Sequence, residues 1–476
     1  MIDVPIAVIV LAAGEGTRMK SATPKVLHTL GGRSMLGHVL AAAAPLRPAY
    51  TVVVVGHGGE QVAEHLAGLD PKARTALQEE RRGSGHATAL ALTAFAERDG
   101  FVVVVNGDAP LLTAGTVQAL VDDHRSRGAA LTVLTAEVAD PAGLGRITRA
   151  GDGSVTGIVE QADADDDQRR IREVNAGVYA VDTALLAVTL PRLSTDNSKG
   201  EQYLTDVLGL LIDDGHVVRA LVAADPDDTL GCNDRVELAA RRRTLNDRIL
   251  AAWMRAGVTV VDPATTWVDV DVELAPDVTL LPGSALSGRT TVATAATIGP
   301  DTTLLDCTVG SAASVVRSHC LSADIGERAT VGPYTYLRPG ARLGRAAKAG
   351  SFVEIKASDI GEGAKVPHLS YVGDATVGPG SNIGAATVVV NYDGVAKHRT
   401  VVGAHARVGS DTMLVAPVTI GDGAYTAAGS VITDDVPPGA MGVGRARQRN
   451  IRDWVRRRRP GSPAAEAAAR AEDTAE

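Results

Sequence analysis

The chain has 476 residues, more than a single hydrophobic core normally serves, so we expect two or three domains. Hydrophobic residues make up 45% of it and charged residues 22%, which is typical of a globular protein and excludes a disordered one. The formal net charge of -9 argues against a nucleic acid as the main partner, although a phosphate group held by local geometry is still compatible with it.

The cysteines and the N-terminus indicate where the protein works. Cys232, Cys307 and Cys320 form no close pair and no metal-ligand spacing, which fits a reducing compartment better than a disulfide framework. The apolar start of the chain contains Pro5 and lacks the basic residues that begin a signal peptide. No apolar run reaches the roughly 18 residues that cross a bilayer. We therefore expect a cytoplasmic protein without membrane partners.

Up to about residue 235 the chain alternates short β-branched runs with longer amphipathic stretches. The apolar runs that begin at Ile6, Thr51, Phe101 and Ala130 predict strands covered on both faces, as in a parallel sheet. Helix-like segments such as SMLGHVLAAAAPL and AGTVQALVDDHRSRG lie between them. This alternation predicts a Rossmann-like open α/β sheet, which binds ligands at the carboxyl ends of its strands.

Two segments at such strand ends suggest a phosphate site. LAAGEGTRM contains Gly14 and Gly16, whose backbone N–H groups could approach a phosphate, while Arg18 and Lys25 add positive charge. It lacks the third glycine of a dinucleotide-binding fingerprint, and by itself an ordinary strand-helix turn is an equal alternative. Asp108 follows another buried strand and suits Mg²⁺, although a turn or a helix cap would also explain an acidic residue there.

A run with helical spacing at 236–256 predicts a linking helix, and beyond it the period changes. Apolar residues recur every five or six positions, often followed by glycine, which is the hexapeptide repeat of a parallel β-helix. A β-sandwich would instead alternate with period two and show hairpin turns. The predicted inward residues are Ile298, Leu304, Val309, Val315, Leu321, Ile325, Val331, Leu337, Leu343, Ile355, Ile360, Val366, Val372, Val377, Ile383, Val389, Val402, Val408, Leu414, Ile420 and Ile432.

The β-helix half also contains a candidate base. His368 interrupts a coil of apolar and small residues, and imidazole titrates in the range that a base for amine acylation needs. A lone histidine on such a fold is more often a surface residue, but Glu354 lies 14 residues earlier, less than one coil away, and could orient the ring. The rhythm breaks at VVNYDGVAKHRTVV, which predicts an outward loop of the kind that serves binding.

These patterns divide the chain into an α/β domain at 1–235, a linker helix at 236–256, a β-helix domain at 257–445 and a tail at 446–476. Four consecutive arginines in the tail suggest a phosphate contact, but a flexible, solvated end is the favoured interpretation.

The motifs LAAGEGTRM, PKVLHTLGG, GSGHA, NGDAPLL, GLGRITR and GIVEQ resemble those of the sugar nucleotidyltransferases. With SFVEIKAS, HLSYVGDA, NYDG and VGSDTMLVAPVTIG, the chain from about Pro5 to Arg445 resembles the bacterial bifunctional N-acetylglucosamine-1-phosphate uridylyltransferase/glucosamine-1-phosphate acetyltransferase family. The resemblance implies acetylation of glucosamine 1-phosphate by acetyl-CoA on a left-handed β-helix. It also implies transfer of UMP from UTP to N-acetylglucosamine 1-phosphate, with Mg²⁺ as cofactor and pyrophosphate as the second product.

In the first half, the resemblance assigns phosphate binding and catalysis to Lys25, and Mg²⁺ binding to Asp108 and Asn233. Asn106 stands where many members have tyrosine, and Ser84 where many have threonine. The implied contacts of UTP and the sugar nucleotide are Leu11, Ala12, Ala13, Gly14, Arg18, Lys25, Gln78, Gly83, Ser84, Asn106, Gly107, Asp108, Gly145, Glu160, Asn175 and Asn233.

In the second half, the resemblance assigns the base to His368 and implies a homotrimer through the β-helix. Lys397 matches a residue that reaches into a neighbouring subunit's site. Pro367 and Ala386 depart from the family pattern. The implied amino-sugar phosphate contacts are Arg338, Lys356, Tyr371, Asn382 and Lys397, and those of acetyl-CoA are Ala385, Asn391, Tyr392, Ser410, Ala428 and Arg445.

Two alternatives make different predictions. A single-activity nucleotidyltransferase whose β-helix only assembles or regulates would lack both His368 and the NYDG loop. A non-enzymatic binding protein with the same two folds would have lost Arg18, Lys25 and Asp108. The chain has all of these features.

Overall fold

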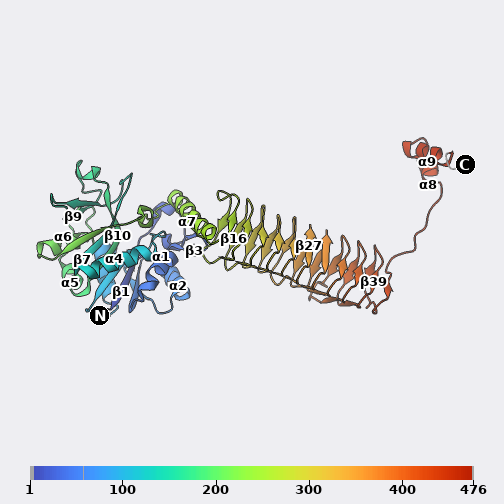
Figure 1. Cartoon of the computed structure of the whole chain (residues 1–476), viewed down its shortest axis with the longest axis horizontal. Coiled ribbons are helices and arrows are strands. Elements are labelled where there is room, and N and C mark those ends of the chain that lie inside the picture. The colour runs from blue at the N-terminus through green and yellow to red at the C-terminus, as the bar shows by residue number, and fades with distance from the viewer. Residues whose placement is uncertain (1–4, 57, 474–476) are drawn as a thin grey trace. The chain divides into compact units, whose positions relative to one another are not determined.

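The computed structural model describes residues 5–56 and 58–473. The chain separates into two compact units, with the division between Thr290 and Thr291. The first unit contains an open α/β sheet followed by a long helix and the first β-helix coils, and the second contains the rest of the β-helix and two terminal helices (Figure 1).

The α/β sheet has the strand order β11-β7-β10-β6-β1-β4-β5. Its centre is parallel: β1 (Ile6–Leu11) pairs with β4 (Tyr50–Val55) and with β6 (Phe101–Asn106). At the edges, β5 (Arg74–Leu77) is parallel to β4, and β11 (Val218–Val222) is parallel to β7 (Leu131–Glu137). The structure therefore confirms the four strands that the apolar runs of the sequence predict.

Among the seven strands of this order, one departs from the parallel arrangement. β10 (Glu173–Asp182) lies between β6 and β7 and is antiparallel to both. From β7 through β8 (Arg146–Arg149) and β9 (Val155–Val159) to β10 the chain forms no α-helix. Since a parallel pair needs a long crossover and an antiparallel pair does not, this segment inserts an antiparallel strand into the sheet.

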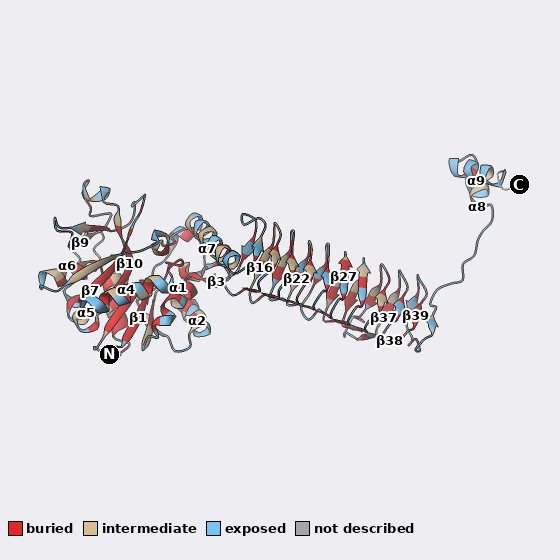
Figure 2. Ribbon diagram, in the orientation of Figure 1, coloured by how far each residue is buried: buried red, intermediate tan, exposed pale blue. Residues whose placement is uncertain are grey.

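Alternate residues of the central strands pack against helices on opposite faces. Val8 and Val10 face a cluster formed with α1 (Met35–Ala43), α2 (Gly59–Leu69) and α4 (Ala114–Arg127). Ala7 and Ile9 face the cluster formed with α3 (Ser84–Leu92), α5 (Thr183–Thr189) and α6 (Asp206–Asp213). Figure 2 shows these strands as the buried layer between the helices. Both faces are covered, which is why the strands read as unbroken apolar runs.

The helical spacing at 236–256 corresponds to α7 (Arg235–Arg255). Asn246 is buried on this helix and docks it on the first coil: its Nδ2 donates to the carbonyl of Thr266 (2.9 Å), and its Oδ1 accepts from the N–H of Val268 (3.1 Å). The guanidinium of Arg243 lies 4.2 Å from the ring centre of Trp267. The coil is therefore anchored by hydrogen bonds between a side chain and the backbone and by a cation–π contact.

In the second unit, short strands stack in parallel to form the three sheets of a left-handed β-helix. Within this unit the first sheet runs from β18 (Thr297–Ile298) to β41 (Met441–Gly442), the second from β19 (Thr303–Leu305) to β40 (Val431–Ile432) and the third from β17 (Thr291–Val292) to β38 (Val418–Ile420). The coils that matter below carry β25 (Tyr336–Leu337), β27 (Lys348–Ser351), β28 (Glu354–Lys356), β30 (Lys365–His368), β31 (Tyr371–Gly373), β33 (Asn382–Ile383) and β34 (Val388–Val390).

The predicted inward residues are buried with one exception. Leu321 is partly exposed, and the inward position belongs to Cys320, which has no exposed surface. The coil takes two successive five-residue steps, from Val315 to Cys320 and on to Ile325, whereas the prediction of Leu321 assumes a six-residue step from Val315. A step of five residues and a step of six residues both bring an apolar residue to the inside of the coil. The position of an apolar residue in the sequence therefore does not show which step the coil takes.

Tyr334, Phe352 and Leu369 occupy successive coil corners with φ of 60°, 58° and 50°, and their side chains are exposed. The rings of Tyr334 and Phe352 stack with centres 5.2 Å apart.

The tail, expected to be a flexible end, contains α8 (Trp454–Arg458) and α9 (Pro463–Asp473), joined by an ion pair between Arg456 and Glu472 (2.5 Å).

Candidate active sites

The carboxyl ends of β1 and β6 lie side by side, since Leu11 pairs with Asn106 and the N–H of Gly107 donates to the carbonyl of Leu11 (2.9 Å). A pocket of about 310 Å³ opens at this edge. Its lining includes most of the predicted nucleotide contacts: Leu11, Ala12, Ala13, Gly14, Lys25, Gln78, Gly83, Ser84, Asn106 and Asp108. Sequence reasoning missed Arg81 and Glu201, which also line it.

Glycine is required at two positions around this pocket. Gly16 has a φ of 64°, and a Cβ there would lie 2.6 Å from the Cβ of Lys25, so glycine lets Lys25 approach the loop. Gly83 has a φ of 102° and packs against the backbone of Gln202. Gln78 holds the same turn by donating to the carbonyl of Gly83 (3.0 Å). These contacts fix the loop that the resemblance assigns to uracil.

Three predicted residues from distant segments meet beside the pocket. The ammonium of Lys25 forms an ion pair with Asp108 and a hydrogen bond with Oδ1 of Asn233 (3.3 Å). Arg18 donates to the same oxygen (2.9 Å). Glu237, which sequence reasoning missed, fixes Asn233 by accepting from its backbone N–H (2.7 Å). A carboxylate and a carboxamide oxygen therefore converge on one cation, and oxygen donors of this kind suit Mg²⁺.

A second cavity, of about 570 Å³, adjoins the first because Asn106 and Asp108 line both. It holds the predicted sugar contacts Gly145, Glu160 and Asn175. Burial raises the pKa of Glu160, whose carboxylate accepts a hydrogen bond from Thr205 (3.3 Å). Sequence reasoning did not identify Asp140, Glu237 and Arg241, which also line this cavity, because no motif marks them.

Asn175 is held by its own strand. Its Nδ2 donates to the hydroxyl of Tyr179 (2.7 Å), and its Oδ1 accepts from the N–H of Gly177 (2.9 Å). Gly177 has a φ of 70°, and a Cβ there would collide with the carboxamide of Asn106. Asn106 therefore places its side chain, as well as its backbone, at the wall that the two cavities share.

A third site lies on the second sheet of the β-helix. Arg338 donates to Glu354 (2.8 Å), and Lys356 pairs with Asp374 (3.3 Å). Asn391 is buried and donates to Asp374 (2.5 Å) and to the hydroxyl of Tyr371 (3.3 Å). Residues from successive coils are thus brought together, and Asp374, which the sequence did not reveal, is a partner shared by Lys356 and Asn391.

The outward loop places Lys397 at this site. Lys397 lies within hydrogen-bonding reach of Lys356 of the same chain, and this contact with a like charge lowers the pKa of Lys397. Asp393 shapes the loop by accepting from the N–H groups of Val395 (2.8 Å) and Ala396 (2.7 Å). The resemblance relates Lys397 to a neighbouring subunit's site, and within one chain it already lies beside a phosphate-binding candidate.

His368 ends β30, and Tyr371 begins β31 at the next corner. The imidazole of His368 is exposed, and the carboxylate of Glu354 is engaged by Arg338. The predicted orientation of the imidazole by Glu354 therefore stays a prediction. Asn382 begins β33 on the neighbouring sheet, where it pairs with Lys365.

The predicted acetyl-CoA contacts follow the coil corners. The N–H of Asp411 donates to the carbonyl of Ala385 (2.7 Å), and the N–H of Gly429 donates to the carbonyl of Ser410 (2.9 Å), which stacks these corners in register. A Cβ on Gly429, next to Ala428, would lie 3.9 Å from the side chain of Arg445. Tyr392 stands apart with its hydroxyl bonded to the carbonyl of Gly394 (2.7 Å).

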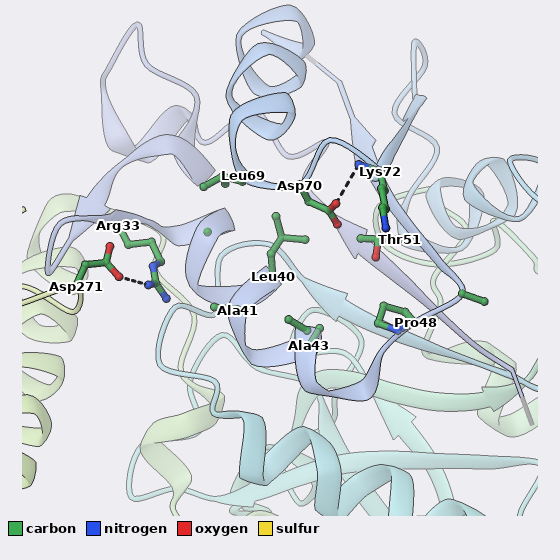
Figure 3. Close-up of a pocket in the computed structure, with 13 residues that line it drawn as sticks. Arg33, Leu40, Ala41, Ala43, Pro48, Thr51, Leu69, Asp70, Lys72 and Asp271 are labelled. Atoms are coloured by element: carbon green, nitrogen blue, oxygen red, sulfur yellow. Dashed lines mark hydrogen bonds and ion pairs between the residues drawn. The ribbon is translucent and has the colours of Figure 1, made fainter. Parts of the chain in front are cut away.

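A separate cavity of about 540 Å³ lies outside these sites (Figure 3). It is formed between α1, the segment before β4 and the end of α2, where Leu40, Ala41, Ala43 and Leu69 give it an apolar wall. Arg33 and Asp271 form an ion pair at its edge (2.6 Å). None of the sequence-predicted site residues lines it.

Comparison with known proteins matches both halves. The model of the MobA-like NTP transferase domain matches residues 8–181, and that of the bacterial transferase hexapeptide (six repeats) matches residues 399–434. Among the curated relatives are three proteins named bifunctional protein GlmU. That of Streptomyces avermitilis is 59% identical over 98% of this chain and 97% of the relative, that of Streptomyces coelicolor 60% over 98% and 97%, and that of Corynebacterium aurimucosum 55% over 98% and 97%.

Within residues 5–56 and 58–473, the structure contains no helix that is both long and apolar enough to span a bilayer.

Proposed function

The chain belongs to the family of bifunctional GlmU proteins, and we propose that the residues gathered in its two halves carry out the two transfers of that family. It is a bifunctional enzyme with a nucleotidyltransferase half that uses a nucleotide substrate and a hexapeptide acetyltransferase half. The β-helix half acetylates glucosamine 1-phosphate, and the α/β half transfers UMP from UTP to the resulting N-acetylglucosamine 1-phosphate with release of pyrophosphate.

For uridylyl transfer, we propose that UTP binds along Leu11–Gly14 and the turn at Gln78 and Gly83, and that the sugar phosphate binds in the cavity of Gly145, Glu160 and Asn175. A phosphate oxygen of the sugar attacks the α-phosphorus of UTP in line, and pyrophosphate leaves. The positive charges of Lys25 and Arg18 stabilise the charge that develops on the phosphate oxygens. The chemistry requires no protein nucleophile.

Asp108 and Asn233 fit a divalent cation, because their oxygens already converge on the ammonium of Lys25. When bound, Mg²⁺ would neutralise charge on the phosphates and help to orient them. Glu237 would keep Asn233 in position, since it accepts hydrogen bonds from both the backbone and the side chain of that residue (2.7 and 3.3 Å).

For acetyl transfer, the amino group of the sugar must be neutral before it attacks the thioester carbonyl. We propose that His368 accepts its proton, that the amine attacks, and that coenzyme A leaves as the thiol. Arg338, Lys356 and Lys397 would surround the sugar phosphate, which is a sensible arrangement for a dianion. Tyr371 and Asn382 complete this site, and acetyl-CoA would follow the corners at Ala385, Ser410 and Ala428 to Arg445, with Asn391 and Tyr392 beside it.

We further propose that the active form is a homotrimer, because exposed apolar side chains at the β-helix corners, Tyr334, Phe352 and Leu369, need a partner surface. A closed threefold ring would cover one corner of each β-helix.

The observation that carries the proposal is the meeting of Lys25, Asp108 and Asn233 at the wall between two cavities. Asp108→Ala should abolish uridylyl transfer and leave acetylation near the wild-type rate, and His368→Ala should do the reverse. Each rate is measured separately on the purified variants. Loss of both activities from either substitution, in protein with an unchanged unfolding profile, would contradict two autonomous sites.

A further inference from the structure

A buried arginine lies behind the wall of the sugar cavity. Arg146 begins β8 and has only 1% of its surface exposed, and it is the largest fully buried side chain among the described residues. Its guanidinium hydrogen-bonds to neutral oxygens, and its Nε has no partner among the described residues. Burying a charge whose hydrogen bonds go to neutral oxygens is costly, although the attraction of Asp140 offsets part of that cost.

The guanidinium connects three segments that are separate in sequence. Nη1 donates to the carbonyl of Leu144, and Nη2 donates to Oε1 of Gln161 (2.7 Å) and, over a longer distance, to the carbonyl of Arg169 (3.4 Å). Oε1 of Gln161 also accepts from the N–H of Gly143 (3.1 Å). One side chain and its amide partner thus hold the loop before β8 against the chain that follows β9.

These segments carry the residues that line the sugar cavity. Gly143, Leu144 and Gly145 come from the loop, and Glu160 directly precedes Gln161. The carbonyl of Gly145 accepts from the N–H of Asn175 (2.9 Å), so the loop in turn sets the third predicted sugar contact. The hydrogen bonds from the guanidinium to Leu144 and Gln161 therefore fix groups that directly adjoin the predicted sugar contacts Gly145 and Glu160.

We propose that Arg146 is a positioning residue that sets the affinity of the uridylyltransferase site for its sugar phosphate. It does not touch the substrate; it holds the loop and Gln161 so that Gly145, Glu160 and Asn175 face one another across the cavity. The planar fork of arginine can reach divergent acceptors together, which an ammonium group on a flexible stem cannot. The inference rests on the proposed function, since it assigns the cavity to the sugar phosphate.

The test compares Arg146→Lys with Arg149→Lys in steady-state uridylyl transfer. Arg146→Lys should raise the KM for N-acetylglucosamine 1-phosphate by about tenfold or more, because hydrogen bonds from a charged group to buried acceptors are lost. The KM for UTP and the acetylation rate should stay near wild type. Arg149 is the matched control, because it lies on the same strand but pairs with Glu173 (2.6 Å).

A second variant decides the matter if Arg146→Lys does not fold. Gln161→Ala removes the amide partner and leaves the charge in place, and we expect the same selective rise in KM for the sugar phosphate. In the double variant the two effects should not add, because both substitutions break one network. Equal changes in both KM values, or no change in the KM for the sugar phosphate, would overturn the inference. Failure of the wild-type enzyme to use N-acetylglucosamine 1-phosphate would instead overturn the proposed function.

Discussion

Lys25 forms an ion pair with Asp108 while its ammonium also donates a hydrogen bond to Oδ1 of Asn233 (3.3 Å), so a cation of the chain occupies the position between two candidate metal ligands. The two oxygens come from segments that are distant in sequence, the end of β6 and the start of α7. A divalent cation prefers the same oxygens and must compete with Lys25 for them. Metal binding would release the ammonium toward the substrate phosphates.

Lys25→Met should therefore separate metal binding from catalysis. Without the competing ammonium, affinity for Mn²⁺ in the absence of nucleotide should rise by about tenfold, because a nearby positive charge is removed. Uridylyl transfer should fall by about a hundredfold or more, because charge stabilisation at the phosphates is lost. Electron paramagnetic resonance titration with Mn²⁺ measures the first effect. Lys72→Met, far from this edge of the sheet, is the control, and weaker Mn²⁺ binding by Lys25→Met would contradict the competition.

Glu160→Gln should make stability less sensitive to pH. Burial raises the pKa of Glu160, so the folded state favours the neutral carboxyl group, and wild-type stability falls as pH rises from the ordinary carboxyl range through the raised pKa. At pH 7.5 the variant should unfold about 2–4 °C higher than wild type, and near pH 4 the difference should disappear. Its KM for the sugar phosphate should rise. Calorimetry across this pH range, with the exposed Glu64→Gln as control, checks the sign; a difference that grows toward low pH would refute it.

Gly373→Ala should impair acetyl transfer selectively. A Cβ on Gly373 would collide with the hydroxyl of Tyr371 and lie 2.8 Å from Nδ2 of Asn391. Both side chains must move, so we expect the KM for glucosamine 1-phosphate to rise by about tenfold. Steady-state acetylation and uridylyl transfer are measured in parallel, with Gly68→Ala as control because a Cβ there meets nothing within 4 Å. An unchanged KM would show that Tyr371 and Asn391 do not shape this site.

Phe352→Asp should dissociate the proposed trimer. Phe352 is 59% exposed and lies between Tyr334 and Leu369 at successive corners. Aspartate tolerates the positive φ of this corner, so the backbone should be unaffected while a charge enters the apolar surface. Sedimentation velocity should show a monomer that retains uridylyl transfer and loses acetyl transfer. Val188→Asp introduces the same charge at an exposed valine of α5 and should sediment as wild type; if Phe352→Asp does so too, this corner is not the interface.

The sequence predicts the strands and coils well, because burial leaves a direct mark on residue type. The run at Phe101 and the inward valines of the β-helix are buried, and burial favours apolar side chains. The direction of β10 left no such mark, since pairing direction depends on connections and not on the strand itself. Leu321 was misplaced because coil steps of five and six residues both keep an apolar residue inward.

Among the site residues, glycines and motif residues could be found from the sequence, but their supports could not. Asp374 and Arg146 act by contacting residues from other segments, and Glu237 acts on Asn233, four residues before it. Arg146 lies in a stretch of alternating polar and apolar residues, where nothing distinguishes a buried arginine from a solvated one. Such residues become visible only when the topology places their partners around them.

The docking of α7 by Asn246 has a practical consequence for the β-helix. A stack of coils ends in unpaired backbone groups, and such an edge recruits further strands from other molecules. The carboxamide of Asn246 hydrogen-bonds to the backbone carbonyl of Thr266 and to the backbone N–H of Val268, and α7 shields the adjoining coil. An isolated acetyltransferase half should thus begin no later than Arg235, since a shorter fragment would expose its first coil and polymerise end to end.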